Sequence, residues 1–153
     1  MVLEKRFYDD GTVLWEGEVV DGCLHGFSKY YFLDGTLSSS CLYRKGKKDG
    51  KEFFYRKEGG ITCLKQYHEG YLHGVQEYYF ANGNIKTKLY YDKGFLAGVE
   101  QYYENGAPQR KVEMKQGKRH GFDRFFEEGG AVRFAIKYMM GKLIDDSNCC
   151  EKT

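Results

Sequence analysis

The sequence predicts an all-β protein: a single-layer meandering antiparallel sheet of six stacked β-hairpin repeats that together form an elongated solenoid. Three observations predict this fold. Glycines recur every 23 or 24 residues, adjacent aromatic residues occupy the same place in most repeats, and apolar and polar residues alternate between them. Alternation with period two is typical of strands with one buried face, because helical apolar positions recur every three or four residues.

Three series of glycines define the repeats. The first series is Gly22, Gly46, Gly70, Gly94, Gly117 and Gly141. A second series begins at Gly26, four residues behind the first, and a third begins at Gly11. The predicted repeats are residues 3–26, 27–50, 51–74, 75–98, 99–121 and 122–145, followed by a polar tail of residues 146–153.

Within each repeat, the first strand carries the aromatic pair, as at Tyr78-Tyr79. Asp-Gly or Asn-Gly follows, as at Asn82-Gly83, and we expect these pairs to supply the positive φ of a tight hairpin turn. The second strand alternates, so that Thr87 and Leu89 share one face and Lys88 lies on the other. A single hairpin is marginally stable, so each repeat is expected to pair with its neighbours in a sheet of about twelve strands.

The aromatic pairs divide between the two faces of the sheet, because neighbouring residues of a strand point in opposite directions. Counting from the Asn-Gly turn places Tyr79 on the side of the charged residues. The second members of the pairs, together with Phe7, are therefore expected to form an aromatic ladder that binds a protein partner. The predicted partner-binding residues are Tyr31, Tyr55, Tyr79, Tyr103 and Phe126. Ring stacking that stiffens the sheet is compatible with this role.

Two clusters of basic residues surround turns between repeats. The candidate anion contacts among their members are Arg44, Lys47, Lys48, Lys118 and Arg119. They are either a solvated rim or contacts for an anionic partner, such as an acidic protein or an anionic lipid. The net charge of +2 is too small to indicate nucleic acid.

The sequence predicts no catalytic residues, no metal site and no cofactor. Three histidines, His25, His73 and His120, share one repeat position, but neighbouring copies lie too far apart to hold one metal ion and are expected to be turn residues. No phosphate-binding glycine motif occurs. The protein is therefore expected not to be an enzyme.

The five cysteines are odd in number and have no Cys-x-x-Cys spacing, which favours a reducing compartment and a cytoplasmic location. Cys41 and Cys63 are expected to be small buried apolar residues, and Cys149-Cys150 to lie in an exposed tail. The segment from Gly141 to Ile144 is expected to fold over the last strand as a cap, which would keep the protein mostly monomeric.

Segments such as Tyr78–Gly83 followed by Tyr91–Gly98 resemble MORN repeats of the variant form, Y-Y-x-N-G, a spacer, then Y-x-x-G-x-x-x-G. The resemblance extends over residues 3–145, although Pro108 interrupts the second strand of the fifth repeat and Asp145 replaces the last glycine. It implies a β-hairpin solenoid used for protein–protein contact. Some relatives are linked to membrane lipids, and bacterial chains of the variant form are described as antitoxin or immunity-like.

These observations predict a non-catalytic interaction module or scaffold that binds a protein through its aromatic face. One alternative, from the resemblance, is an antitoxin or immunity protein that neutralises a toxin. A second alternative is peripheral binding to anionic lipid through the two basic turns.

Overall fold

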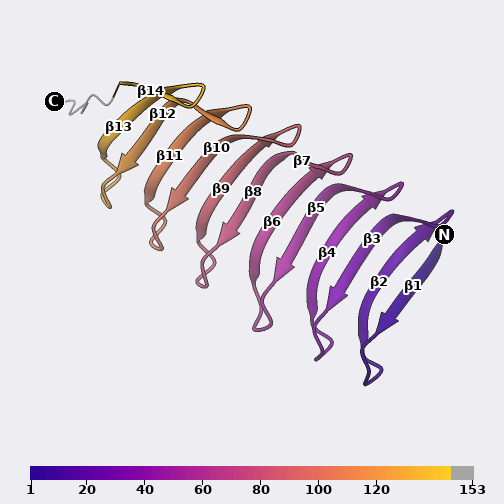
Figure 1. Cartoon of the computed structure of the whole chain (residues 1–153). Helices are drawn as coiled ribbons and strands as arrows, with labels where there is room; N and C mark the ends of the chain where they lie inside the picture. The colour runs from indigo at the N-terminus through magenta and orange to yellow at the C-terminus, as the bar shows by residue number, and fades with distance from the viewer. Residues whose placement is uncertain (146–153) are drawn as a thin grey trace. The chain divides into compact units, whose positions relative to one another are not determined.

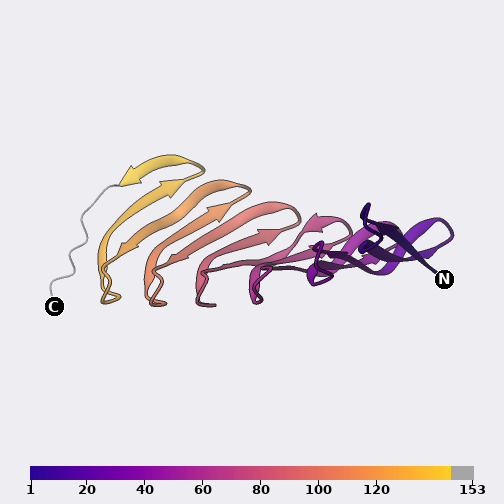
Figure 2. The same ribbon diagram turned by 90° about the horizontal axis from the view of Figure 1, so that it is seen from below.

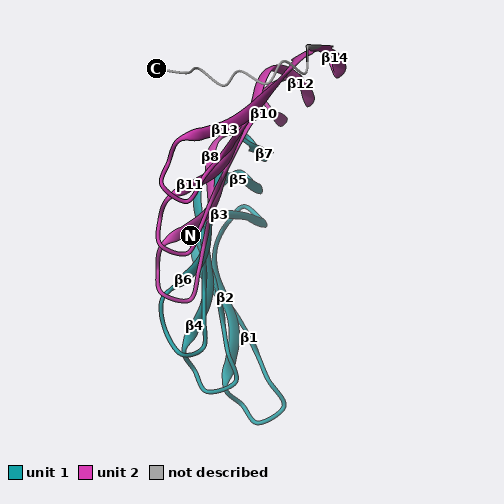
Figure 3. Ribbon diagram, turned by 90° about the vertical axis from the view of Figure 1, so that its left-hand side faces the viewer, with its two compact units in different colours: residues 1–73 teal, residues 74–153 magenta. Residues whose placement is uncertain are grey.

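The computed structural model describes residues 1–145, which form fourteen β-strands and no helix. The chain divides into two compact units, one of residues 1–73 and one that begins at Gly74 (Figure 3). Within each unit, every strand pairs antiparallel with the strands that adjoin it in sequence (Figure 1). The predicted all-β fold and its meandering antiparallel topology are confirmed.

The first unit contains seven strands joined by short turns. They are β1 (Val2–Phe7), β2 (Val13–Val20), β3 (Cys23–Tyr31), β4 (Leu37–Arg44), β5 (Lys47–Tyr55), β6 (Ile61–His68) and β7 (Tyr71–Leu72). The second unit repeats the same arrangement, and Figure 2 shows its hairpins following one another. Its strands are β8 (Gly74–Tyr79), β9 (Ile85–Asp92), β10 (Phe95–Tyr102), β11 (Pro108–Lys115), β12 (Lys118–Phe126), β13 (Val132–Met139) and β14 (Lys142–Asp145).

Two kinds of turn alternate along the chain. Turns such as Lys45-Gly46 have positive φ at both residues, 49° and 77°, which is the geometry of a tight type I′ turn. The loop from Phe80 to Asn84 is longer, and in it only Gly83 has positive φ, at 88°. Asn82 instead accepts a hydrogen bond from the Asn84 N–H on its side-chain oxygen at 2.9 Å. The predicted positive φ of the Asn-Gly pair is therefore confined to the glycine.

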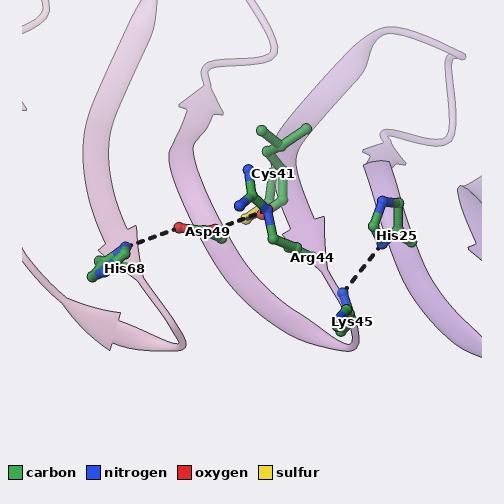
Figure 4. Close-up of polar contacts among 7 residues, drawn as sticks. His25, Cys41, Arg44, Lys45, Asp49 and His68 are labelled. Atoms are coloured by element: carbon green, nitrogen blue, oxygen red, sulfur yellow. Dashed lines mark hydrogen bonds and ion pairs between the residues drawn. The ribbon is translucent and has the colours of Figure 1, made fainter.

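The type I′ turns of successive hairpins are linked by backbone hydrogen bonds. The Gly46 N–H donates to the carbonyl oxygen of Leu24 at 2.8 Å, and in the second unit the Gly141 N–H donates to that of Arg119 at 2.7 Å. Two of the recurring histidines, His25 and His120, accept a backbone hydrogen bond from the same turns. His25 Nδ1 accepts the N–H of Lys45 at 3.4 Å (Figure 4). The histidine position therefore has a structural role in holding one turn against the next.

Few side chains are buried, because a sheet of one layer has no second layer to cover it. The most deeply buried ones lie on the face that carries Ser28, Glu52, Gln76 and Asp123, which we call the buried face. Cys41 and Cys63 are also buried, as predicted. We call the opposite face the ladder face, after the aromatic ladder described below. The buried residues thus combine polar side chains with a few apolar ones, such as Trp15, Leu64 and Val112, and form no continuous aliphatic layer among the described residues.

The C-terminal cap is not formed as predicted. Residues Lys142–Asp145 pair with β13 as a further strand of the meander, with Tyr138 opposite Leu143. Leu143 and Ile144 stay exposed. The turn at Met140-Gly141 has the same type I′ geometry as the earlier turns and therefore directs the chain into pairing, not across the sheet. Cys149 and Cys150 lie outside the described residues.

Candidate binding surface

The aromatic ladder is defined by cross-strand pairs that recur in both units. Each ladder residue lies beside a β-bulge, where the second strand holds one extra residue. The pairs are Phe7–Val13, Tyr31–Leu37 and Tyr55–Ile61 in the first unit, and Tyr79–Ile85, Tyr102–Pro108 and Phe126–Val132 in the second. The structure therefore places Tyr31, Tyr55, Tyr79 and Phe126 at equivalent positions, as the sequence predicted.

Tyr103 does not belong to the ladder. Gly98 and Gly106 are one residue closer in sequence than Gly74 and Gly83, so the first strand of the fifth hairpin is one residue short. Tyr102 consequently takes the ladder position. Tyr103 begins the loop instead, and its N–H donates to the carbonyl oxygen of Ala107 at 2.8 Å. The prediction that Tyr103 lies in the ladder was wrong, because it aligned the aromatic pairs and did not count back from Gly106 in this hairpin.

Three ladder tyrosines donate their hydroxyl to a glutamate on the same face. Tyr31 donates to Glu16 Oε1 at 2.6 Å, and Tyr79 donates to Glu77 Oε2 at 2.6 Å. Tyr102 makes the same bond to Glu100. The sequence analysis missed these glutamates. In the second unit a signal existed, because a glutamate stands two residues before each ladder tyrosine.

Lysines complete each tyrosine–glutamate pair. In the first unit Lys5 and Lys29 lie 3.4 and 3.6 Å from the carboxylate of Glu16. Burial, and then the hydrogen bond to Glu16, raise the pKa of Tyr31 to about 12. The bond from Tyr31 in turn lowers the pKa of Glu16. The ring of Tyr31 is thus fixed by a charge-assisted hydrogen bond on a surface of alternating charges.

The second unit repeats this arrangement at Glu100. Burial alone would raise the pKa of this carboxyl group, but hydrogen bonds from Tyr102, Lys111 and Tyr90 outweigh it and lower the pKa. The Nζ atom of Lys111 lies 3.1 Å from Glu100 Oε1. Tyr79 and Tyr102 are half-buried, so each presents part of its ring to solvent in a fixed orientation.

Three of the five predicted anion contacts are already paired with carboxylates inside the sheet. Arg44 Nε lies 3.3 Å from Asp49, which also contacts His68 (Figure 4). Lys48 pairs with Glu52, and Arg119 lies 3.7 Å from Asp123. Lys47 and Lys118 are exposed at the turns.

The pairs Lys48–Glu52 and Arg119–Asp123, whose carboxylates are buried, depend on a backbone kink. Residues four apart in a regular strand are about 13 Å apart, too far for an ion pair. A glycine lies between each pair, Gly50 with φ 122° and Gly121 with φ 101°, and bends the strand so that the side chains meet. Sequence spacing alone therefore did not predict these ion pairs.

No group of three or more histidine, cysteine, aspartate or glutamate side chains among residues 1–145 is arranged to hold a metal ion. The same part of the chain contains no helix long and apolar enough to cross a membrane.

A family model for the MORN repeat variant matches residues 72–93. The chain carries a variant-type MORN repeat. For residues 72–93, this match confirms the resemblance seen in the sequence. The matched MORN segment contains the ladder residue Tyr79, its glutamate Glu77 and the loop that follows them.

Curated proteins give no match to the sequence. Among solved structures, TarM from S. aureus, in a mutant crystallised with Fondaparinux, alpha-GlcNAc-glycerol and UDP, is 17% identical with a TM-score of 0.43, over 62% of this chain and 19% of that chain. Accessory secretory protein 1, 2 and 3 of Streptococcus pneumoniae is 19% identical with a TM-score of 0.41, over 71% of this chain and 19% of that chain. The chain thus spans about a fifth of the length of each structure.

Proposed function

We propose that this protein is a non-catalytic binding module or scaffold that engages another protein through its ladder face. The observation that carries the proposal is that half-buried tyrosines are hydrogen-bonded through their hydroxyls to glutamates in each unit, at Tyr31 in the first and at Tyr79 and Tyr102 in the second. Tyrosine is enriched at protein interfaces, where a large ring supplies contact area and the hydroxyl stays polar.

The hydrogen bonds to glutamate favour binding by fixing the rings before a partner arrives. Ordering a free side chain at an interface costs roughly 0.5–1.5 kcal/mol. A ring already held by a carboxylate avoids much of this cost. The neighbouring lysines, such as Lys88 at 3.8 Å from Glu77, give the surface a mixed charge that suits a polar protein partner better than a strongly charged one.

The proposal is tested by capturing partners from the native source with the intact chain as bait. Tyr79→Ala and Tyr102→Ala should lose a partner that the parent chain captures. Phe95→Ala is the matched control, because it removes an exposed aromatic ring outside the ladder of the same unit. Circular dichroism and thermal melting confirm that each bait is folded. A partner retained equally by both ladder variants contradicts the proposal.

An antitoxin would be a special case of this binding role, and its support is the family resemblance alone. A toxin encoded beside this gene, whose toxicity co-expression relieves, would support it. The lipid alternative has less support than the sequence suggested, because Lys48 and Arg119 are paired with the buried carboxylates of Glu52 and Asp123. Sedimentation with anionic liposomes at low salt and at about 0.5 M salt tests it, because electrostatic binding weakens as salt screens the charges.

A further inference from the structure

A second surface feature includes a row of side chains on the buried face of the second unit. Cross-strand pairing places Gln101 beside Arg110, Arg110 beside Phe125, and Phe125 beside Phe134. These four side chains form one row across β10, β11, β12 and β13. In the other hairpins from the second onward, the residue equivalent to Gln101, five positions before the loop glycine, is aromatic: Tyr30, Phe54, Tyr78 and Phe125.

The residue missing from the fifth hairpin explains this exception. The shortened strand moves Gln101 into the row and moves the ring of Tyr102 to the ladder face. A hollow of about 370 Å³ lies at this place, lined by Gln101, Gln109, Arg110, Phe125, Arg133 and Phe134, and also by Tyr103 and the ladder residue Phe126. We call it the Gln101 pocket.

One wall of the Gln101 pocket is fixed and already neutralised. Arg110 donates from Nε and Nη2 to the two carboxylate oxygens of Asp123 at 2.8 and 2.7 Å. Asp123 is only 1% exposed, so this pair is a structural part of the wall. The guanidinium also lies 4.8 Å from the ring centroid of Phe125, which stacks on Phe134 at 4.4 Å. This wall therefore offers apolar ring surface but little free charge.

The other wall carries an available positive charge. The guanidinium of Arg133 lies 3.7 Å from Glu127, but the two side chains are 68% and 59% exposed. Exposed ion pairs of this kind are worth about 0–1 kcal/mol and are easily displaced. The amides of Gln101 and Gln109 add neutral hydrogen-bond donors beside this charge. The pocket thus combines one available cation, two amides and an apolar wall.

We propose that the Gln101 pocket binds a carboxylate side chain from an acidic segment of a partner protein, with an adjacent apolar group against Phe125 and Phe134. This inference rests on the proposed protein-binding function and names the partner's chemistry at one site. A single available guanidinium matches the single charge of a carboxylate. It matches a phosphate dianion less well, because the second arginine is already committed to Asp123.

The test uses 3-phenylpropanoate as a probe, because it joins one carboxylate to one ring. It is titrated into the full ¹⁵N-labelled chain while the side-chain amides of Gln101 and Gln109 and the Nε of Arg133 are followed by NMR. We expect saturable shifts at these groups with a Kd on the order of millimolar, the affinity range of small fragments. The neutral analogue 3-phenylpropan-1-ol and inorganic phosphate should each bind at least about tenfold more weakly, a difference of about 1.4 kcal/mol.

Two variants separate the pocket from general surface effects. Gln101→Phe restores the aromatic residue found in the other hairpins, so it should fill the hollow, preserve folding and abolish the shifts. Arg133→Gln should weaken probe binding at least tenfold and leave the thermal midpoint unchanged. Lys142→Gln is the matched control, because it removes an exposed charge outside the pocket, and it should bind the probe like the parent chain.

Equal binding of the alcohol, preferential binding of phosphate, or full probe binding by Gln101→Phe would each overturn the inference. The outcome is also separable from the proposed function. If a captured partner depends on Tyr79 and Tyr102 but is retained by Gln101→Phe and Arg133→Gln, the pocket assignment fails and the binding role of the ladder stands. If the pocket variants lose the partner and the ladder variants keep it, the ladder assignment fails instead.

Discussion

The hairpins β8–β9 and β10–β11 carry the same Tyr-Tyr pair and the same Asn-Gly loop, yet they orient the pair differently. In the first hairpin Tyr78 lies on the buried face, opposite Thr87, and Tyr79 lies in the ladder. In the second hairpin it is the first tyrosine, Tyr102, that lies in the ladder. The loop glycine therefore sets the register, and the aromatic pair follows it.

The residue missing from the fifth hairpin also changes the φ angle of the glycine that closes the preceding turn. Gly26, Gly50 and Gly121 all have positive φ, between 101° and 122°, whereas Gly98 does not. One missing residue thus alters a ladder tyrosine, a row on the buried face and a backbone conformation in one hairpin. The two hairpins therefore predict that the same substitution changes stability by unequal amounts at positions with the same sequence motif.

The largest expected difference is between two closing glycines. Gly121→Ala should lower the free energy of unfolding by about 3 kcal/mol, because φ is +101° and the new Cβ would lie 2.1 Å from Glu113 Oε2. Gly98→Ala should change it by less than about 1 kcal/mol, because its nearest new contact is an ordinary 3.4 Å to Tyr90. Denaturant unfolding measures both. Equal losses at the two glycines would contradict the shifted register.

The next effect compares the two tyrosines of the shortened strand. Tyr102→Phe should destabilise the protein by about 1–2 kcal/mol, because it removes a donor to the charged Glu100. Tyr103→Phe should have an effect below about 0.5 kcal/mol, because this residue is tied to the loop through its backbone. The reverse order in denaturant unfolding would indicate that Tyr103 holds the ladder position.

A smaller effect concerns acid stability of the same hairpin. The pKa of Glu100 is lower in the folded state than its ordinary value of 4.5. Its contribution to stability is therefore present above pH 4.5 and is lost as the pH falls through the lowered folded pKa. Glu100→Gln should lose stability at pH 7 and depend less on pH below 4.5 than the parent chain. If the thermal midpoints of the two chains changed with pH in parallel, the hydrogen bonds to the Glu100 carboxylate would not stabilise the protein.

The smallest effect concerns the type I′ turn between β11 and β12. Gln116 has φ 50° in a type I′ turn. Asparagine tolerates this conformation better, so Gln116→Asn should stabilise the protein by about 0.5 kcal/mol. A destabilised variant in thermal unfolding would mean that this turn is not of the type I′ form.

Much of the fold was predictable because every turn contains at least one glycine with positive φ, so the spacing of these glycines reports the turns directly. The ladder was predictable wherever the second member of the aromatic pair stands four residues before the loop glycine, as Tyr79 does before Gly83. The shifted position of Gln101 was missed because the prediction aligned the aromatic pairs, although the shorter distance from Gly98 to Gly106 signals the missing residue. The pairs Lys48–Glu52 and Arg119–Asp123 also escaped prediction, since they require the kink at the intervening glycine.

The register of the fifth hairpin is tested most directly by cross-strand backbone contacts in NMR spectra of the labelled chain. The structure predicts contacts between Gln101 and Arg110 and between Val99 and Val112. A hairpin aligned by its aromatic pair would instead bring Tyr102 opposite Arg110. Observation of the Gln101–Arg110 contacts would support the shifted ladder and the Gln101 pocket together, and observation of Tyr102–Arg110 contacts would contradict both.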